Sequence, residues 1–215
     1  MDSKLRSKLI EIATEKIGYE DPSHDITHTL RVLSAAEQIA TAEKGDLDIV
    51  VPAAIFHDVI NYQKNDPRAK FSATESADFA EEVLNKIPEY PKDKIEAVKI
   101  AITSCSFSKG IIPDKLEAKI LQDADRLEAT GAISIMRTFA STGKMGRPFY
   151  NTEDPFCENR TPDDLKYAVD LFYTRLLKVG EQMHTDTAKV IAKRRTEFLN
   201  DFLAELKHEL NESAS

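Results

Sequence analysis

The residue pair best suited to chemistry in this sequence is His57-Asp58, which follows the apolar segment 49–56, interrupted only by Pro52. An apolar segment of this kind predicts a buried helix, and burying an imidazole beside a carboxylate is costly unless both find partners. A divalent metal ion is a partner that both side chains accept. The pair therefore predicts one part of a metal site, whose other ligands must come from elsewhere in the chain.

Two further predicted helices offer those ligands. His28 follows His24 by four residues, so both imidazoles share a helix face, and we expect His28 to point inward and His24 to lie nearer the opening. Direct chelation by these two histidines, as in zinc proteases, would lack the Glu at the base position. Asp125 follows the apolar pair Ile120-Leu121 on another predicted helix and is the best candidate for a distant carboxylate ligand.

A second HD dipeptide, His24-Asp25, lies at an exposed helix start, where a carboxylate interacts favourably with the helix dipole. His57-Asp58 follows a buried helix instead and is preferred as the metal pair. His24 is then expected to donate a hydrogen bond to substrate. Asp25 is expected to stabilise the helix start or to assist proton transfer. Asp123 is expected to occupy a solvated helix position, the alternative being that it orients a metal ligand.

Helical periodicity dominates the sequence and no convincing alternating strand pattern occurs, so an all-α fold is predicted. The 215 residues do not require a second core. We expect one domain over 1–215, in which C-terminal helices at about 160–210 pack on a motif region at about 20–130. Helices are predicted near residues 5–18, 23–45, 49–60, 74–87, 91–105, 117–128, 131–141, 165–179 and 187–210.

Composition limits the partners. The formal net charge is -8 and no block of Lys and Arg occurs, so duplex nucleic acid is not expected, although a local basic pocket can still bind a small phosphate ester. No apolar run approaches the roughly 20 residues that span a bilayer, and the first residues carry charge where a signal peptide is apolar. We expect a cytoplasmic protein without a membrane partner. The Phe and Leu stripe of the last helix is core or a homodimer contact.

Taken together, the ligand candidates have the order H…HD…D, and the chain resembles the HD-domain superfamily of metal-dependent phosphohydrolases, most closely a stand-alone bacterial and fungal subgroup. The resemblance covers residues 20–210. It rests on five phrases: His24-Asp25-x-x-His28 with Arg31-Val32, Phe56-His57-Asp58, Ser106-Phe107-Ser108, the segment 122–133, and Glu153-Asp154-Pro155-Phe156.

The resemblance implies a helical HD-domain bundle that cleaves a phosphoester or phosphoanhydride bond of a small phosphorylated molecule such as a nucleotide. It implies a divalent ion (Mn, Mg, Fe, Co or Ni) bound by His28, His57, Asp58 and Asp125, with His24, Asp58 and Asp25 as the catalytic residues. The expected substrate-binding cations are Arg31, Lys64, Arg68, Lys70, Arg126, Lys144 and Arg147. The last two belong to a glycine-bearing loop, 142–160, that could cover the site.

Two positions depart from the relatives and leave other functions open. Asn61 stands where nucleotidase relatives carry a carboxylate that helps to activate water, and Cys105 stands where many subgroup members have His. These departures favour a degenerate HD module that binds a nucleotide or a protein partner without turnover. An HD-fold oxygenase would need two irons and more histidine ligands, but His184 and His208 lie outside the motif.

Overall fold

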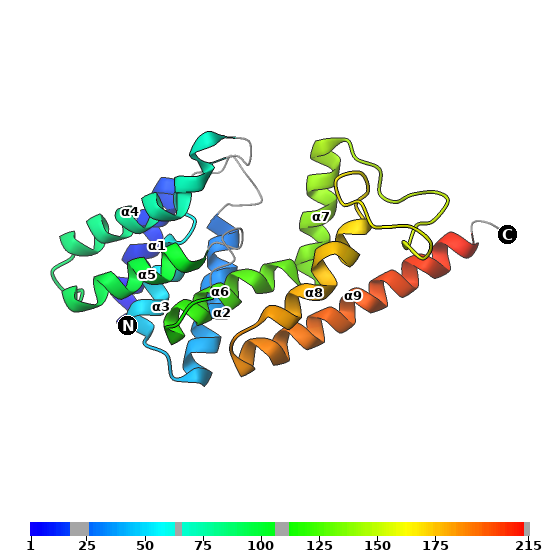
Figure 1. The fold of residues 1–215 in the computed structure, drawn as a ribbon. Coiled ribbons are helices and arrows are strands. Elements are labelled where there is room, and N and C mark those ends of the chain that lie inside the picture. Colours follow the sequence, from blue (N-terminus) through cyan, green and yellow to red (C-terminus); the bar gives the residue numbers. More distant parts are fainter. Residues whose placement is uncertain (18–25, 63–65, 106–111, 213–215) are drawn as a thin grey trace. The chain divides into compact units, whose positions relative to one another are not determined.

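The computed structural model describes residues 1–17, 26–62, 66–105 and 112–212, in which all regular secondary structure is helical (Figure 1). The predicted all-α fold is thereby confirmed. The chain divides into two compact units, Met1–Asp125 and Arg126–Ser215, and each is considered by itself. The packing of the C-terminal helices on the motif region stays a prediction.

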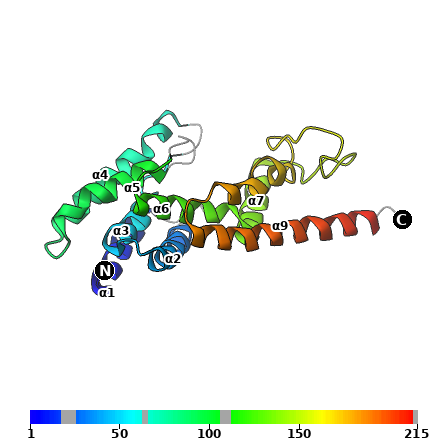
Figure 2. The same ribbon diagram turned by 60° about the horizontal axis from the view of Figure 1, so that its bottom comes forward.

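The first unit is built around α3 (Leu47–Phe56), which contacts α1 (Ser3–Ile17), α2 (Ile26–Glu43), α4 (Ser72–Lys86) and α5 (Ile95–Cys105). Residues 50–56 of α3 are all buried, so this helix forms the centre of the core. The helices α4 and α5 lie side by side in both views (Figures 1 and 2). The unit is completed by α6 (Leu116–Arg126) and by the short 3-10 turns η1 (Pro67–Phe71) and η2 (Lys92–Lys94).

A proline inside α3 is accommodated by a tyrosine from another segment. Asp46 caps the helix by accepting a hydrogen bond from the backbone N–H of Asp48 at 2.9 Å. Pro52 has no N–H, so the carbonyl of Asp48 loses its helical donor. The buried Tyr90 replaces that donor, because its hydroxyl lies 2.7 Å from the same carbonyl. The helix therefore continues past the proline.

The helix α3 ends at Phe56, four residues before the predicted end, and His57-Asp58 lie in the turn that follows. Ser76 of α4 fixes this turn. Its hydroxyl accepts from the Ile60 N–H at 3.1 Å and donates to the Ile60 carbonyl at 3.2 Å. Because Ser76 is fully buried, these bonds are shielded from water. The turn that carries the HD pair is thus attached to the core.

The second unit contains η4 (Leu127–Ala129), α7 (Gly131–Met145), the π-helical turn η5 (Phe172–Leu176), α8 (Leu177–Val179), η6 (Gly180–Gln182) and α9 (Asp186–Glu212). The helices α7 and α9 are in contact, and the rings of Phe172 and Phe202 stack with centroids 5.7 Å apart. The buried apolar cluster of this unit consists of Val169, Phe172, Leu176, Leu199 and Leu203.

The predicted helix 165–179 is wrong in its first part, since helical structure begins only at Asp170. The backbone N–H groups of Ala168 and Val169 donate to the carbonyls of Pro148 and Phe149, at 3.1 and 2.8 Å. These groups are therefore not available for helical hydrogen bonds. Sequence periodicity could not reveal a pairing between segments 20 residues apart.

The segment 142–160 also differs from the expectation, because α7 continues to Met145 and ends at Gly146 with a φ of 63°. The loop that follows is held by its own side chains. The Asp154 carboxylate accepts from the N–H groups of Glu158 and Asn159, at 2.9 and 2.7 Å, and these bonds lower the pKa of Asp154. Asp170, which is fully buried, pairs with Arg160. The loop is thus a folded part of the second unit.

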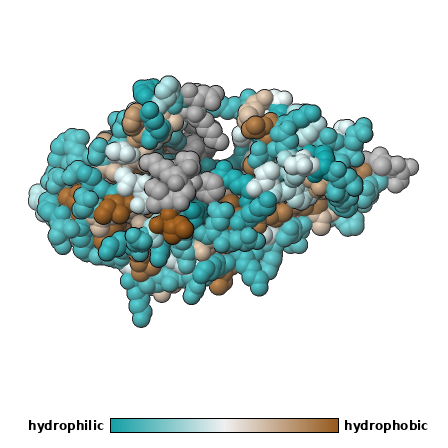
Figure 3. All heavy atoms as spheres, viewed as in Figure 1, coloured by the Kyte–Doolittle hydropathy of each residue, from teal (hydrophilic) through white to brown (hydrophobic). Residues whose placement is uncertain are grey.

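The outer faces of both units are polar. Hydrophilic residues predominate on the faces visible in Figure 3, where apolar residues are scattered. The most exposed large apolar side chains in the described ranges are Leu165 and Ile112. Within those same ranges, no helix combines the length and the apolar character needed to cross a membrane.

Candidate metal centre

Three predicted ligands meet in the first unit. His28 comes from α2, His57 from the turn after α3 and Asp125 from α6, and their ligand atoms all lie within 4.8 Å of one another. The Oδ1 atom of Asp125 is 3.7 Å from Nε2 of His28 and 3.9 Å from Nε2 of His57. Two atoms that each bind one ion at about 2.0–2.2 Å can be at most about 4.4 Å apart. These two distances therefore fit a shared cation.

The tautomer of the neutral His57 ring is selected by the backbone. Its Nδ1 lies 2.8 Å from the carbonyl oxygen of Ala54, which can only accept, so in the neutral ring Nδ1 carries the hydrogen and Nε2 carries the lone pair. That Nε2 atom is buried and has no hydrogen-bond partner among the described residues. A buried nitrogen without a partner destabilises the fold unless a further group binds it. The donor set and its orientation fit a divalent ion.

Asp58 lies at the solvent side of this group. Its Oδ2 atom is 4.0 Å from Nε2 of His28, but it does not belong to the three-residue group. The side chains of Asp58 and Asp125 are 31% and 29% exposed, whereas those of His28 and His57 are 1% and 2% exposed. The imidazoles therefore form the buried side of the site and the carboxylates form its open side.

The part of α6 that carries Asp125 is attached to the end of α5. The buried Gln122 donates to the carbonyl of Ser104 at 2.8 Å, and the Cys105 thiol lies 4.0 Å from Oδ2 of Asp125. Asp123 is fully buried, so the expectation of a solvated position is wrong. The buried face of α6 extends through residues 120–124 and includes the polar Gln122 and Asp123.

Comparisons with known proteins identify the family of the chain. The HD domain family matches residues 25–130. The uncharacterized protein YpgQ of Bacillus subtilis (strain 168) is 32% identical over 195 residues, which are 89% of this chain and 86% of YpgQ. This chain belongs to the HD-domain family.

Solved structures extend this HD-domain likeness over nearly the whole chain. The crystal structure of B. subtilis YpgQ in complex with ADP has a TM-score of 0.73 at 29% identity, and the match covers 96% of this chain and 95% of that chain. A structure described as an HD-superfamily hydrolase from Bacillus thuringiensis also has a TM-score of 0.73, at 28% identity over 97% of each chain. The family match and this description thus agree on an HD-superfamily hydrolase.

Three predicted substrate-binding cations of the first unit lie among the described residues, and each contacts another protein group. Arg31 donates to the Thr27 hydroxyl at 3.2 Å. Arg68 donates to Asp66 at 2.7 Å, and its guanidinium lies 4.4 Å from the centroid of the Tyr62 ring. The Nζ atom of Lys70 is 4.9 Å from the centroid of its neighbouring ring, Phe71. Contact of these three cations with substrate stays a prediction.

The other predicted cations belong to the second unit. Arg126 donates to the carbonyl of Gln182 at 2.7 Å and lies 3.1 Å from Nε2 of His184. Arg147 donates to the Asp164 carbonyl and, at 2.9 Å, to the Thr142 hydroxyl, so it stabilises the loop after α7. Lys144 is exposed near the end of α7. Their binding to substrate, and the closing of the 142–160 loop over the site, stay predictions.

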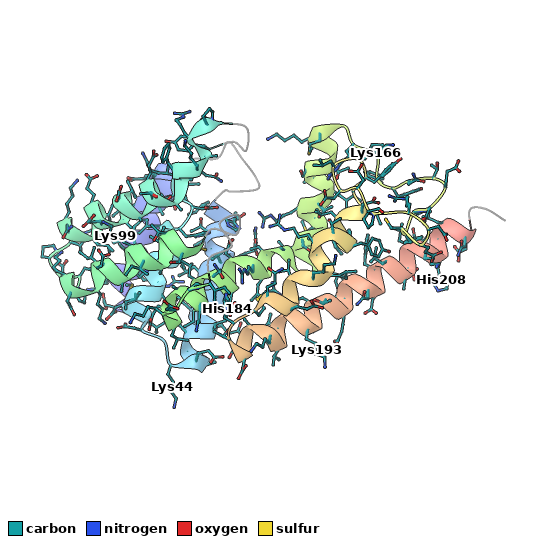
Figure 4. All side chains as sticks on the ribbon, viewed as in Figure 1. Lys44, Lys99, Lys166, His184, Lys193 and His208 are labelled. Atoms are coloured by element: carbon teal, nitrogen blue, oxygen red, sulfur yellow. The ribbon has the colours of Figure 1, made fainter. Side chains whose placement is uncertain are left out.

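Several remaining expectations concern other parts of the chain. His24, Asp25, Lys64 and the Ser106-Phe107-Ser108 phrase lie outside the described residues. His184, after η6, and His208, on α9, both belong to the second unit (Figure 4). Cys105 is buried at the end of α5 and Asn61 is exposed after the HD turn.

Proposed function

We propose that this protein is a metal-dependent phosphohydrolase that cleaves a phosphoester or phosphoanhydride bond of a small phosphorylated molecule, with nucleotides as the first class to test. The observation that carries the proposal is the buried Nε2 of His57, which has no hydrogen-bond partner among the described residues and lies 3.9 Å from Oδ1 of Asp125, while Nδ1 is bonded to the Ala54 carbonyl. The similarity to YpgQ, whose crystal structure contains ADP, supports a nucleotide substrate.

Four residues would hold the metal ion. His28, His57 and Asp125, with Asp58 at the open side, would hold a divalent ion. When bound, such an ion supplies Lewis-acid chemistry that acidifies water and stabilises negative charge on phosphate oxygens. The neutral imidazoles leave the site without added positive charge, and the two carboxylates bring two negative charges. A divalent cation offsets those charges and leaves a site able to accept a phosphate.

Proton transfer is assigned to Asp58. Asn61 is an amide and cannot act as a base at neutral pH. Asp58 is partly exposed at the open side, where an attacking water would enter, and its carboxylate can accept the proton of that water. The new bond joins the water oxygen to phosphorus while the bond from phosphorus to the leaving oxygen breaks. His24 and Asp25 are further candidates for protonating the leaving group.

The test combines metal analysis with a hydrolysis screen. The protein is stripped with a chelator, reloaded with Mn, Mg, Fe, Co or Ni, and assayed separately for phosphate and pyrophosphate release from nucleoside mono-, di- and triphosphates. His57→Ala and Asp125→Ala should each abolish both metal binding and turnover. His208→Ala, which changes an exposed histidine of α9, should leave both unchanged and serves as the matched control.

The outcomes separate the candidate functions. Full turnover by both His57→Ala and Asp125→Ala would show that the catalytic site is elsewhere. Nucleotide binding by the folded protein without product release, under any of the ions, would favour the degenerate binding module. Product release that depends on an ion and on both residues would establish a phosphohydrolase, and the released product would identify the bond.

A further inference from the structure

We infer that Cys105 is a positioning residue, whose thiol holds the carboxylate of Asp125 in the orientation that ligates the metal. This inference rests on the proposed function, because it concerns the same metal centre. It assigns a role to a side chain that stands where many relatives carry His and for which the sequence suggests no chemistry of its own.

The two oxygens of Asp125 face different groups. Oδ1 is the oxygen near the imidazoles, at 3.7 Å from His28 and 3.9 Å from His57. Oδ2 faces the thiol of Cys105 at 4.0 Å. A thiol is a weak donor and a carboxylate oxygen only accepts, so the S–H group is directed toward Oδ2. The contact leaves Oδ1 as the oxygen presented to the ion.

A second contact fixes the position of the thiol. Gln122 lies three residues before Asp125 on α6, and its amide donates to the carbonyl of Ser104 at 2.8 Å. Ser104 directly precedes Cys105 at the end of α5. Gln122 is fully buried and Cys105 is 5% exposed, so both donor side chains belong to the interior of the unit. The end of α5 is thereby held in register with the helix that carries the ligand.

The consequence for the metal follows from the freedom of a carboxylate. Asp125 is 29% exposed, and without a group on Oδ2 it can rotate toward solvent or present both oxygens to an ion. The thiol disfavours both alternatives. Groups that orient a metal ligand in this way are typically worth about 10–100-fold in metal affinity. We expect an effect in this range, toward its lower end, since a thiol is a weak donor.

The experiment measures metal binding directly instead of turnover. The dissociation constants for Mn²⁺ and Co²⁺ are determined by chelator competition for the full chain and for Cys105→Ala, Cys105→Ser and Asp125→Ala. We expect Cys105→Ala to bind about tenfold more weakly and to change the visible absorption spectrum of bound Co²⁺. Cys105→Ser keeps a donor and should recover part of the affinity. Cys157→Ala, in the second unit, is the matched control and should bind as the wild type does.

Each outcome has one meaning. If Cys105→Ala binds both ions within twofold of the wild type with an unchanged Co²⁺ spectrum, while Asp125→Ala loses binding, the thiol only packs and the inference is wrong. An intense sulfur-to-cobalt charge-transfer band in the wild type would make Cys105 a ligand and would also overturn it. Undiminished binding by Asp125→Ala would instead overturn the proposed metal centre. Should Cys105→Ala fail to fold, Cys105→Val fills the volume of the side chain without a hydrogen-bond donor, and its metal affinity is compared with the wild type in the same way.

Discussion

The Nδ1 atom of His57 lies 2.8 Å from the carbonyl oxygen of Ala54, which belongs to the last turn of α3. This hydrogen bond satisfies one of the last carbonyls of α3 and at the same time selects the tautomer that a metal ligand needs. The hydrogen bond that caps the end of α3 therefore also orients the His57 ring in the candidate metal centre. This hydrogen bond also affects the position of Asp58, because Asp58 follows His57 in the turn after the cap.

Asp58→Asn should lower turnover more than it lowers metal content. The amide keeps the shape of the side chain but removes its charge and its ability to accept a proton. Asp125 lies within 3.9 Å of both imidazoles and belongs to the three-residue group, whereas Asp58 does not belong to it, so the ion should still bind. We expect kcat to fall by about 10²-fold or more. Steady-state kinetics and metal analysis of the same sample check this, and an unchanged kcat would exclude Asp58 as the base.

Gly131→Ala should destabilise the second unit. Gly131 begins α7 with a φ of 66°, and an added Cβ would lie 3.1 Å from the Cβ and Cγ atoms of Arg195. The left-handed conformation costs a residue with a Cβ about 1–2 kcal/mol, and Arg195 must move from its 2.8 Å hydrogen bond with the Leu127 carbonyl. Urea denaturation should therefore show a lower free energy of unfolding.

Gly143→Ala is the matched control for that prediction. Gly143 lies inside α7, and an added Cβ would meet no atom within 4 Å. Alanine is favoured over glycine in a helix by roughly 0.5–1 kcal/mol, so this variant should be stabilised. Equal destabilisation by both substitutions would mean that the conformation of Gly131 has no special importance.

The residues of the candidate metal centre could be predicted from the sequence, but the contacts around them could not. His28, His57 and Asp125 are recognisable because ionisable groups beside apolar helical segments need partners. Cys105 and Gln122 carry no such signal, since their role arises only when α5 meets α6. Helix types and most boundaries followed the periodicity. The boundaries failed where distant groups supplied the hydrogen bonds, as Ser76 does for the turn after α3 and the carbonyls of segment 148–149 do for segment 168–169.

Arg160→Met should destabilise the second unit strongly. Burial alone would raise the pKa of Asp170, but hydrogen bonds from Arg160 and from the Asp163 N–H outweigh it and lower that pKa. Removing the guanidinium leaves a fully buried carboxylate without its cation, which typically costs about 3–5 kcal/mol. Thermal and urea denaturation measure the loss. The double variant Arg160→Met with Asp170→Leu should recover part of it, and simple additivity of the two changes would contradict a coupled pair.

Lys94→Met should remove an acid-sensitive part of the stability of the first unit. The Nζ atom of Lys94 lies 2.8 Å from Oδ2 of Asp48, and this hydrogen bond is the main cause of the lowered pKa of that carboxyl. A carboxyl with a lowered pKa in the folded state stabilises the protein fully above its ordinary pKa of 3.8, and the stabilisation is lost as the pH falls through the folded value. The wild type should therefore be more stable than Lys94→Met near neutral pH, and this advantage should shrink below about pH 4. Urea denaturation between pH 7 and pH 3 gives the difference at each pH.

Lys86→Met removes a more exposed i,i+4 pair with Glu82 and should change the free energy of unfolding by less than about 0.5 kcal/mol throughout. If the wild type kept its full advantage over Lys94→Met at pH 3, the contribution of Lys94 would be packing of its aliphatic chain and not its charge.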